Sequence, residues 1–541
     1  MYRRGEITKQ TNNQIKNKLN KDINNAKHKY FLDEFAKHKK NMKRYWIILN
    51  QISGKTKNKN EIVEILDGNN SLTSKPEIVS KFSDFFSNIA LQLDNDLQNS
   101  TESPLQYLTS NPRSFFCSPV TESEVEKLIL NSKITKTDVN QMPIKILKNL
   151  RYYVSAPLSK IINSSFLSGI FPHDLKLARI TPIFKNGDNR ITSNYRPIAS
   201  LPFFSKIFER CMTNRLLSFF NKNSLFSQSQ FGFLKNKSTE DAVIDLTEAI
   251  YDSLNSKKHH VSLMIDLKKA FDTVNHNILL KKLQLYGIRG IGLDWIRDYL
   301  TNRRSYVALG KDSSGTKVTN IGIPQGSVIG PILFIIYIND LPKTSDYLRA
   351  TLFADDTTLS FSHADFNTIK TTLNTELSNV EKWTTANRLT INVNKTEMLL
   401  FSNLPVPPDY NNQIAFTNEI LTFKSSCKFL GVLLDDKLNF SDHINYVISK
   451  ISRTTGILYK IRNQLPIQAR LNFYYSFVYP YLTYNITSWG GTNQTHLQPL
   501  IIQQKKIVRI MTNSHFLEHT TPLFHRLRLL KIPDIYELHL H

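Results

Sequence analysis

The pattern of apolar and polar residues in the middle of the chain predicts a small β-sheet. Residues 261–265 are dominated by apolar side chains, which indicates a buried strand. Residues 349–353 and 357–361 are rich in apolar and β-branched side chains, and Asp355 and Asp356 lie between them. Because Asp is rare in strands and common in turns, these segments predict a β-hairpin with two acids at its tip.

Helical spacing of apolar residues prevails in other parts of the chain. It predicts a helix over residues 366–388 and a largely helical region from residue 440 to the end, where lysines and arginines alternate with the apolar positions. Thr121, with Glu124 three residues later, is typical of the start of a helix. The apolar face of the first helix consists of Ile369, Leu373, Leu377 and Val380.

The charge of the chain indicates a polyanionic partner. The net charge is +24 and the pI about 9.6, which suits either nucleic acid or an anionic membrane. The longest apolar run, residues 328–338, is too short for a membrane span, so it predicts a buried helix and favours nucleic acid, with no membrane. Cys117, Cys211 and Cys427 are far apart in sequence, which excludes a disulfide framework and indicates a reducing compartment.

The N-terminal 60 residues contain sixteen Lys and Arg against four Asp and Glu. Their intermittent apolar spacing fits one or two basic helices that bind RNA, and it fits a solvated linker equally well. Ser53-Gly-Lys-Thr56 resembles the end of a phosphate-binding loop, but the earlier glycine of that motif is missing and no apolar strand precedes it, so we reject that interpretation.

Three carboxylates form the candidate chemical centre. Asp266 directly follows the strand at 261–265, where a buried strand emerges at a site, and Asp355 and Asp356 are expected at the hairpin tip. Adjacent carboxylates repel each other unless cations are present. Three of them on neighbouring strand ends are the minimum set for two Mg²⁺ ions. An isolated Asp-Asp pair would more often be an ordinary acidic turn.

Three motifs in order resemble a known family. Asp266 lies in Ile-Asp-Leu-Lys-Lys-Ala-Phe-Asp, residues 322–331 read Gly-Ile-Pro-Gln-Gly-Ser-Val-Ile-Gly-Pro, and residues 353–356 read Phe-Ala-Asp-Asp. They resemble motifs A, B and C of reverse transcriptases, most closely the non-LTR (LINE-type, jockey-like) retrotransposon enzymes. The resemblance covers about residues 120–530 and is strongest over 176–435.

The resemblance implies an α+β right-hand polymerase with fingers, a palm built on an antiparallel sheet, and a helical thumb. The expected divisions are a basic N-terminal helical or linker region (1–70), a helical region before the fingers (71–165), the fingers and palm (166–435), and the thumb with the C-terminal region (436–541).

The resemblance also implies the reaction. Asp266, Asp355 and Asp356 would be both catalytic and metal-binding, with two Mg²⁺ ions as cofactor and Mn²⁺ as a possible substitute. The chain would add dNTPs to a primer 3′-hydroxyl on an RNA template, by two-metal-ion phosphoryl transfer, in target-primed reverse transcription. Its partners would be template RNA, primer or target DNA, and dNTPs.

Around the incoming nucleotide the resemblance places Lys185, Arg196, Phe271, Gln325, Gly326 and Lys395. Residues 176–185 and 194–198 predict a hairpin whose two cations bind phosphates, although both could be ordinary surface cations.

The other four residues of this set have different expected roles. Phe271 would exclude a ribose 2′-hydroxyl, and Gln325 would touch the nascent base pair or nucleotide. Gly326 would let the backbone approach the base or nucleotide closely. Lys395, in a segment that resembles motif D, would protonate the pyrophosphate or be a simple turn lysine.

Two further segments are expected to contact nucleic acid. Phe429, Leu430 and Gly431 resemble the primer grip of motif E. In the loop before a predicted helix over 239–254, capped by Thr239, Lys235 and Lys237 would line a template groove. Phe231 and Phe233 of that loop are expected in the core rather than stacked on bases.

Two alternatives stay open. One is a non-catalytic RNA-binding relic of a reverse transcriptase, and intact carboxylates argue against it. The other is a group II intron-type maturase, disfavoured because its motif C usually starts with Tyr. About 110 to 160 residues precede the polymerase core, too few for an apurinic-type endonuclease, so that domain or protein is expected to be missing from this chain. The family implies an intracellular protein of the nucleus and cytoplasm.

Overall fold

The computed structural model describes residues 8–38, 41–52, 62–98, 100–132, 142–408, 410–412, 414–417 and 419–541. Its contacts divide the chain into two compact units: Ile62–Lys424, and Met1–Glu61 together with Ser425–His541. Residues 53–56, whose resemblance to a phosphate-binding loop was rejected above, lie outside the described residues. The four divisions of the chain expected from the sequence stay a prediction.

The central element of the first unit is a four-stranded antiparallel sheet, here called the palm sheet. Its strands lie in the order β11-β5-β10-β9: Glu397–Phe401, His259–Ile265, Asp356–His363 and Arg349–Phe353. The expected α+β class, antiparallel palm sheet and hairpin are therefore confirmed. The hairpin tip differs in one detail. Phe353 pairs with Asp356, so Ala354 and Asp355 form the two-residue turn and Asp356 begins β10.

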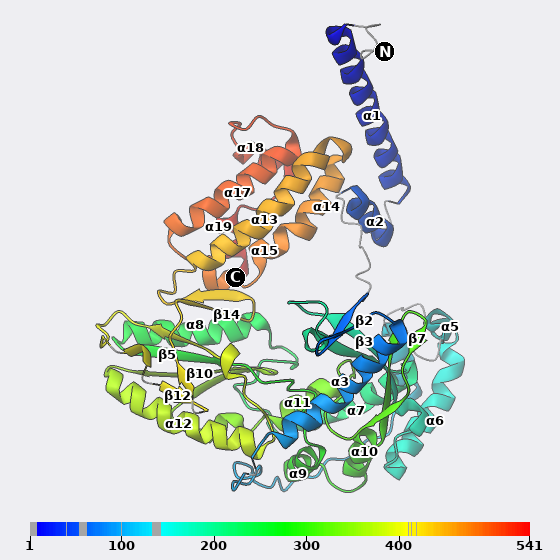
Figure 1. The fold of residues 1–541 in the computed structure, drawn as a ribbon, viewed down its shortest axis with the longest axis vertical. Helices are drawn as coiled ribbons and strands as arrows, with labels where there is room; N and C mark the ends of the chain where they lie inside the picture. The colour runs from blue at the N-terminus through cyan, green and yellow to red at the C-terminus, as the bar shows by residue number, and fades with distance from the viewer. Residues whose placement is uncertain are drawn as a thin grey trace. The chain divides into compact units, whose positions relative to one another are not determined.

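Helices cover both faces of the palm sheet (Figure 1). Helix α8 (Thr239–Asn255) packs against β5 and β9, and α12 (Phe366–Ala386) packs against β10. The four apolar residues expected on one face of α12 are buried, as predicted. Helix α11 (Gly330–Tyr337) has no exposed face and packs on α9 (His276–Tyr286), which confirms the buried helix expected after motif B.

A five-stranded mixed sheet, here called the fingers sheet, forms the other half of this unit. Strands β3 (Leu177–Phe184) and β4 (Tyr195–Ser200) make the predicted hairpin. Strand β6 (Arg303–Leu309) runs parallel to β3 and pairs with β7 (Asp312–Ser313) and β8 (Lys317–Thr319). Helix α3 (Lys75–Asn95) packs across this sheet. Other α-helices and strands of the unit are β1 (Ile65–Asp67), β2 (Asn70–Leu72), α4 (Glu122–Asn131), α5 (Ile144–Asn149), α6 (Arg151–Ser168), α7 (Phe203–Lys222), α10 (Ile291–Leu300), β12 (Ile414–Phe416) and β13 (Glu419–Leu421).

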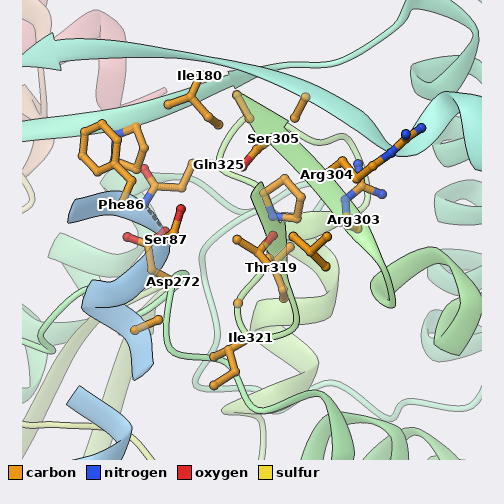
Figure 2. Close-up of a pocket in the computed structure, with 18 of the residues that line it drawn as sticks. Phe86, Ser87, Ile180, Asp272, Arg303, Arg304, Ser305, Thr319, Ile321 and Gln325 are labelled. Atoms are coloured by element: carbon orange, nitrogen blue, oxygen red, sulfur yellow. Dashed lines mark hydrogen bonds between the residues drawn. The ribbon is translucent and has the colours of Figure 1, made fainter. Parts of the chain in front are cut away.

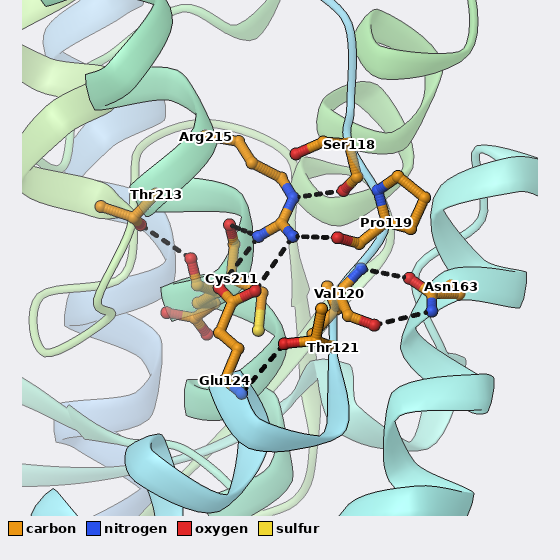
Figure 3. A network of polar contacts seen from close by, with 10 residues as sticks. Ser118, Pro119, Val120, Thr121, Glu124, Asn163, Cys211, Thr213 and Arg215 are labelled. Carbon is orange, nitrogen blue, oxygen red and sulfur yellow. Dashed lines mark hydrogen bonds and ion pairs between the residues drawn. The ribbon is translucent and has the colours of Figure 1, made fainter.

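An arginine holds the irregular segment that leads into α4 (Figure 3). The buried Arg215 of α7 donates to the carbonyls of Ser118 and Pro119 and forms a two-pronged ion pair with Glu124 of α4 at 3.0 and 3.1 Å. Asn163 of α6 donates to and accepts from the backbone of Val120. A planar guanidinium can donate to several acceptors at once. This one side chain therefore supplies hydrogen bonds that the pairing of a regular strand would otherwise give to the backbone of the segment.

The second unit is mainly helical. It contains the hairpin β14 (Ser426–Phe429) and β15 (Val432–Asp435). The N-terminal helices α1 (Lys9–Lys37) and α2 (Met42–Ile52) belong to it, and Trp46 packs edge-on against Phe477 with 4.8 Å between ring centroids. Its other helices are α13 (Ser441–Ile461), α14 (Ile467–Phe477), α15 (Tyr479–Thr483), α16 (Ile486–Trp489), α17 (Gln494–Thr512), α18 (Thr521–Leu527) and α19 (Ile532–Leu540).

Two details of the helices bear on the predictions. Helix α8 is capped by Ser238, which forms a capping box with Asp241, so the expected cap at Thr239 was wrong by one residue. The cap at Thr121 is confirmed by its bond from the Glu124 amide at 3.2 Å. Within the described ranges, we find no helix that is both long and apolar enough to cross a membrane.

Candidate active site

The three predicted carboxylates lie at one end of the palm sheet. Asp266 follows the last residue of β5, and Ile265 is paired with Thr357 of β10. One step further along the same two strands, Asp266 comes beside Asp356, with Asp355 in the adjoining turn. Antiparallel pairing thus brings together acids that are about ninety residues apart in sequence.

The three carboxylates influence one another electrostatically. Both Asp355 and Asp356 are open to solvent, but the surrounding protein displaces part of their hydration. Together with repulsion from Asp355 and Asp266, this loss of hydration raises the pKa of Asp356 to about 6. Loss of hydration and repulsion from Asp266 raise the pKa of Asp355, although its own backbone amide, Arg196 and Lys185 oppose that rise.

Within the described residues, no three His, Cys, Asp or Glu side chains stand close enough together to hold a metal ion as they are. The donor set nevertheless suits a hard divalent cation, because it consists of carboxylate oxygens whose mutual repulsion such a cation would relieve.

Asn392 is a site residue that the sequence did not reveal. Its side-chain amide donates to the Asp266 carboxylate at 2.7 Å, and its backbone amide donates to the Asp266 carbonyl at 2.8 Å. It begins the turn that contains Lys395, in the segment that resembles motif D. The only signal in the sequence was its position within that segment, which says nothing of a contact with Asp266.

Lys185 and Arg196 act electrostatically on the predicted carboxylates, and Lys269 in turn interacts with both of these cations and with Lys395. Lys185 follows β3 and Arg196 lies on β4, so the fingers hairpin carries both, as predicted. Lys269, three residues after Asp266, was not predicted. Loss of hydration lowers its pKa, Asp272 opposes that change, and Lys185, Arg196 and Lys395 lower it further. The site therefore combines a carboxylate cluster with a cation cluster.

Motifs A and B are joined by specific contacts. The Gln325 side-chain amide donates to the Asp272 carboxylate at 2.8 Å, and loss of hydration raises the pKa of Asp272 to about 6. Phe271 is partly buried and stacks on Phe334 of α11, with ring centroids 4.4 Å apart. Asp272 is therefore held by the side chain of Gln325.

Gly326 has a structural reason to be a glycine. Its φ is +120°, and an added Cβ would lie 2.3 Å from the carbonyl oxygen of Ala199 on β4. The Ala199 amide also donates to the Gln325 carbonyl at 2.7 Å. The close approach here is to a strand of the fingers sheet, whereas the expected close approach to a base or nucleotide stays a prediction.

A cavity of about 190 Å³ lies beside Gln325, as Figure 2 shows. It is lined by α3, the fingers sheet and the motif B loop, with Phe86, Ile180 and Arg303 in its wall. Arg303 is 3% exposed, and its Nε and Nη2 have no hydrogen-bond partner among the described residues. The cavity therefore adjoins motifs A and B on the fingers side and carries buried positive charge.

The loop at residues 229–238, here called the template loop, is more open than expected. Phe233 is 48% exposed, so placing it in the core was wrong, and Phe231 is partly buried with Lys237 Nζ 4.4 Å from its ring centroid. Lys235 is exposed. An exposed ring in a loop that also carries two lysines suits contact with a nucleic-acid base and backbone.

The predicted primer grip is the turn of the β14–β15 hairpin in the second unit. Phe429 is buried, whereas Leu430 and Gly431 form the turn with φ of +42° and +94°. The Tyr484 hydroxyl donates to the Leu430 carbonyl at 2.5 Å. Leu430 and Gly431 are partly exposed at the turn, and contact of these three residues with a primer stays a prediction.

Residues 183–434 match the family described as reverse transcriptase (RNA-dependent DNA polymerase). The matched range contains the palm sheet, the fingers hairpin from its first strand onward, and all three predicted carboxylates.

Relatives from insects resemble a larger part of the chain. It is 28% identical to the "Probable RNA-directed DNA polymerase from transposon X-element" of Drosophila melanogaster, over 72% of this chain and 43% of that protein. It is 27% identical to two others from the same organism. One is the "Probable RNA-directed DNA polymerase from transposon BS", matched over 82% of this chain and 49% of that protein. The other is the "RNA-directed DNA polymerase from mobile element jockey", matched over 80% of this chain and 48% of that protein. The chain thus spans about half the length of the relatives it matches.

Proposed function

Residues 183–434 form a reverse transcriptase domain, and from this premise we propose that the chain is the polymerase part of a non-LTR, jockey-like retrotransposon protein. It adds dNTPs to a primer 3′-hydroxyl along an RNA template. The observation that carries the proposal is the register of the palm sheet, which brings Asp266 beside Asp355 and Asp356.

The three aspartates are proposed to hold two Mg²⁺ ions. Their oxygen donors, their adjacent strand ends and the raised pKa values of Asp355 and Asp356 support a site that needs cations. When bound there, the ions would lower the pKa of the primer hydroxyl and stabilise the pyrophosphate leaving group. Asn392 would fix the orientation of the Asp266 carboxylate through its 2.7 Å hydrogen bond.

The cation cluster is proposed to bind the triphosphate. Arg196 offers two parallel N–H donors to phosphate oxygens, whereas Lys185 and Lys269 act as point charges. Lys395 would protonate the leaving pyrophosphate. The proximity of Lys269 to the other three cations supports its inclusion in this set.

Selection of the nucleotide is proposed to involve motifs A and B. Phe271 would exclude a ribose 2′-hydroxyl, and its stacking on Phe334 would keep the ring from moving aside. Gln325 and Gly326 would contact the nascent base pair, and the hydrogen bond from Gln325 to Asp272 supports a fixed amide there. In the second unit, Leu430 and Gly431 would contact the primer, with Phe429 supporting their turn.

The names of the relatives support a role in a mobile element. We propose target-primed synthesis, in which the primer is the 3′-hydroxyl of nicked chromosomal DNA and the template is the element's RNA. The nick would be made by an endonuclease outside this chain.

The test is primer extension by the purified chain on a heteropolymeric RNA template with dNTPs and Mg²⁺. Asp355→Asn removes one charge at nearly constant volume and should lower the extension rate by about 10³-fold, a loss of roughly 4 kcal/mol of transition-state stabilisation. Asp174→Asn is the matched control, because its carboxylate is fully exposed and lies outside the site.

Three results would contradict parts of the proposal. Equal rates for Asp355→Asn and the wild type would show that the metal site lies elsewhere. No extension by the wild type, with salt-sensitive RNA binding retained, would instead support the relic of a reverse transcriptase. Extension on DNA templates but not on RNA would remove the RNA-directed assignment.

A further inference from the structure

The segment Ser229–Gly232 of the template loop lies along the outer edge of the palm hairpin. The Leu352 amide donates to the Ser229 carbonyl at 2.8 Å, and the Phe231 amide donates to the Leu352 carbonyl at 2.8 Å. This is a short parallel bridge between Gln230 and Leu352. Strand β9, the edge strand of the palm sheet, is therefore paired two residues before the turn that carries Asp355.

The Gln230 side chain reaches the turn itself. It is fully buried, and its Oε1 accepts from the Gly232 amide at 2.7 Å and from the Ala354 amide at 3.2 Å. Both neighbours are donors, so the side chain has to present its oxygen to them. Its Nε2 has no hydrogen-bond partner among the described residues, so Gln230 is bonded to the turn through Oε1.

The turn needs such a support. Ala354 has φ of +56°, a left-handed conformation that is unfavourable for a residue with a Cβ. Gly232 fits closely against it, since an added Cβ would lie 2.4 Å from the Ala354 nitrogen. The loop and the turn therefore fit only with a glycine at 232 and an acceptor at 230.

We propose that Gln230 is a positioning residue for polymerisation: with Gly232 it braces the Ala354 turn and so fixes where Asp355 and Asp356 point. This inference rests on the proposed function and adds a second support for the acidic site, since Asn392 is bonded to the Asp266 carboxylate and Gln230 to the backbone of Ala354, next to Asp355. Small displacements of a reacting group are costly, because geometry contributes strongly to the rate.

The experiment measures the mobility of the Ala354 turn and the catalytic rate separately. Gln230→Met removes the acceptor at similar volume, and Gly232→Ala disturbs the same contact from the other side. Hydrogen–deuterium exchange of residues 348–358 reports whether the turn has loosened, and single-nucleotide extension reports kcat and the KM for dNTP. Gln228→Met is the matched control, because it makes the same change two residues away, on an exposed side chain.

If Gln230 positions the turn, hydrogen–deuterium exchange over residues 348–358 should be faster in Gln230→Met and in Gly232→Ala. In both variants kcat should be lower by about 10²-fold, and the KM for dNTP should stay within about threefold of the wild type. Gln228→Met should match the wild type in all three measurements. Exchange in the rest of the chain separates this outcome from general unfolding, which would speed exchange throughout and lower the apparent kcat by reducing the amount of active enzyme.

Two results would overturn the inference. One is faster exchange in Gln230→Met with unchanged kcat, because the turn would then be loose without consequence. The other is a lower kcat with unchanged exchange, because Gln230 would then act in another way. If the wild type extends no primer, the proposed function fails, and the exchange of Gln230→Met still decides whether this residue holds the turn.

Discussion

Individual backbone positions in the site are fixed by contacts between residues far apart in sequence. Gly326 faces the Ala199 carbonyl, and Gly322, with φ of +82°, has the Asp272 carbonyl 2.4 Å from where a Cβ would be. The Gly322 amide also donates to the Val274 carbonyl at 2.9 Å. These glycines let motif B lie directly against motif A and the fingers sheet, which is how the parts of the site reach one another.

Gly326→Ala should therefore destabilise the protein and impair nucleotide binding. The added methyl group would collide with the Ala199 carbonyl, and the positive φ would be strained, so we expect a loss of about 1–3 kcal/mol in unfolding free energy. The KM for dNTP should rise, because the motif B loop has to move. Thermal denaturation and extension kinetics measure the two effects.

Gly315→Ala is the control for that substitution. It adds the same methyl group where no atom lies within 4 Å and where φ is not positive. If the two variants are equally stable and equally active, the contact with Ala199 does not constrain the loop.

Among the secondary-structure elements, strand β5 leads directly into Asp266, and its side chains are buried on both faces of the sheet. Six of its seven residues are buried, among them His259 and His260. His260 is 3% exposed and bonds Ser253 of α8 at 2.9 Å and Ser262 at 3.1 Å. Burial, with a smaller effect from Arg349, lowers the pKa of His260 to about 4.

This histidine should make folding sensitive to acid. Between pH 6.5 and about 4, the unfolded chain binds a proton at His260 and the folded chain does not, so stability is complete above pH 6.5 and falls as the pH drops towards 4. The shift corresponds to a loss of about 3 kcal/mol at most. Denaturation midpoints measured from pH 7 to pH 4 should fall less steeply for His260→Gln than for the wild type.

His173→Gln serves as the control, because the His173 ring is exposed in the same unit. It should follow the wild-type pH dependence. Identical pH profiles for His260→Gln and the wild type would mean that His260 is already solvated when the protein is folded.

At the scale of the whole molecule, positive charge is the feature that bears on the proposed binding of nucleic acid. The net charge is +24, and both the fingers hairpin and α13 carry exposed cations such as Lys185, Arg196 and Arg453. The second unit combines the basic helix α1 with the C-terminal helices. A surface of this kind binds phosphates with little regard to sequence.

Template binding should therefore weaken steeply with salt. Six to ten phosphate contacts would lower the affinity by about 10³- to 10⁵-fold between 50 and 200 mM salt. Fluorescence anisotropy with a labelled RNA–DNA primer-template measures the slope. Arg453→Gln should reduce the slope by about one, since it removes one phosphate contact. A shallow slope, equivalent to one or two contacts, would contradict binding through the phosphate backbone.

Local sequence determined the elements of the palm and the identity of the acids. Alternation and apolar runs are properties of neighbouring residues, so β5, the hairpin, α11 and α12 could be predicted from the residues they contain. The order of the three motifs pointed to the family, and residues 183–434 match it. The roles assigned to the individual site residues stay predictions.

Tertiary structure alone decided which distant residues support those acids. Gln230 meets the Ala354 turn across more than a hundred residues, Asn392 meets Asp266, and Gly326 meets Ala199. Such contacts depend on how strands are paired and stacked, and no local pattern encodes a partner at that distance. For the same reason, the grouping of the N-terminal helices with the C-terminal helices became visible only in the folded chain.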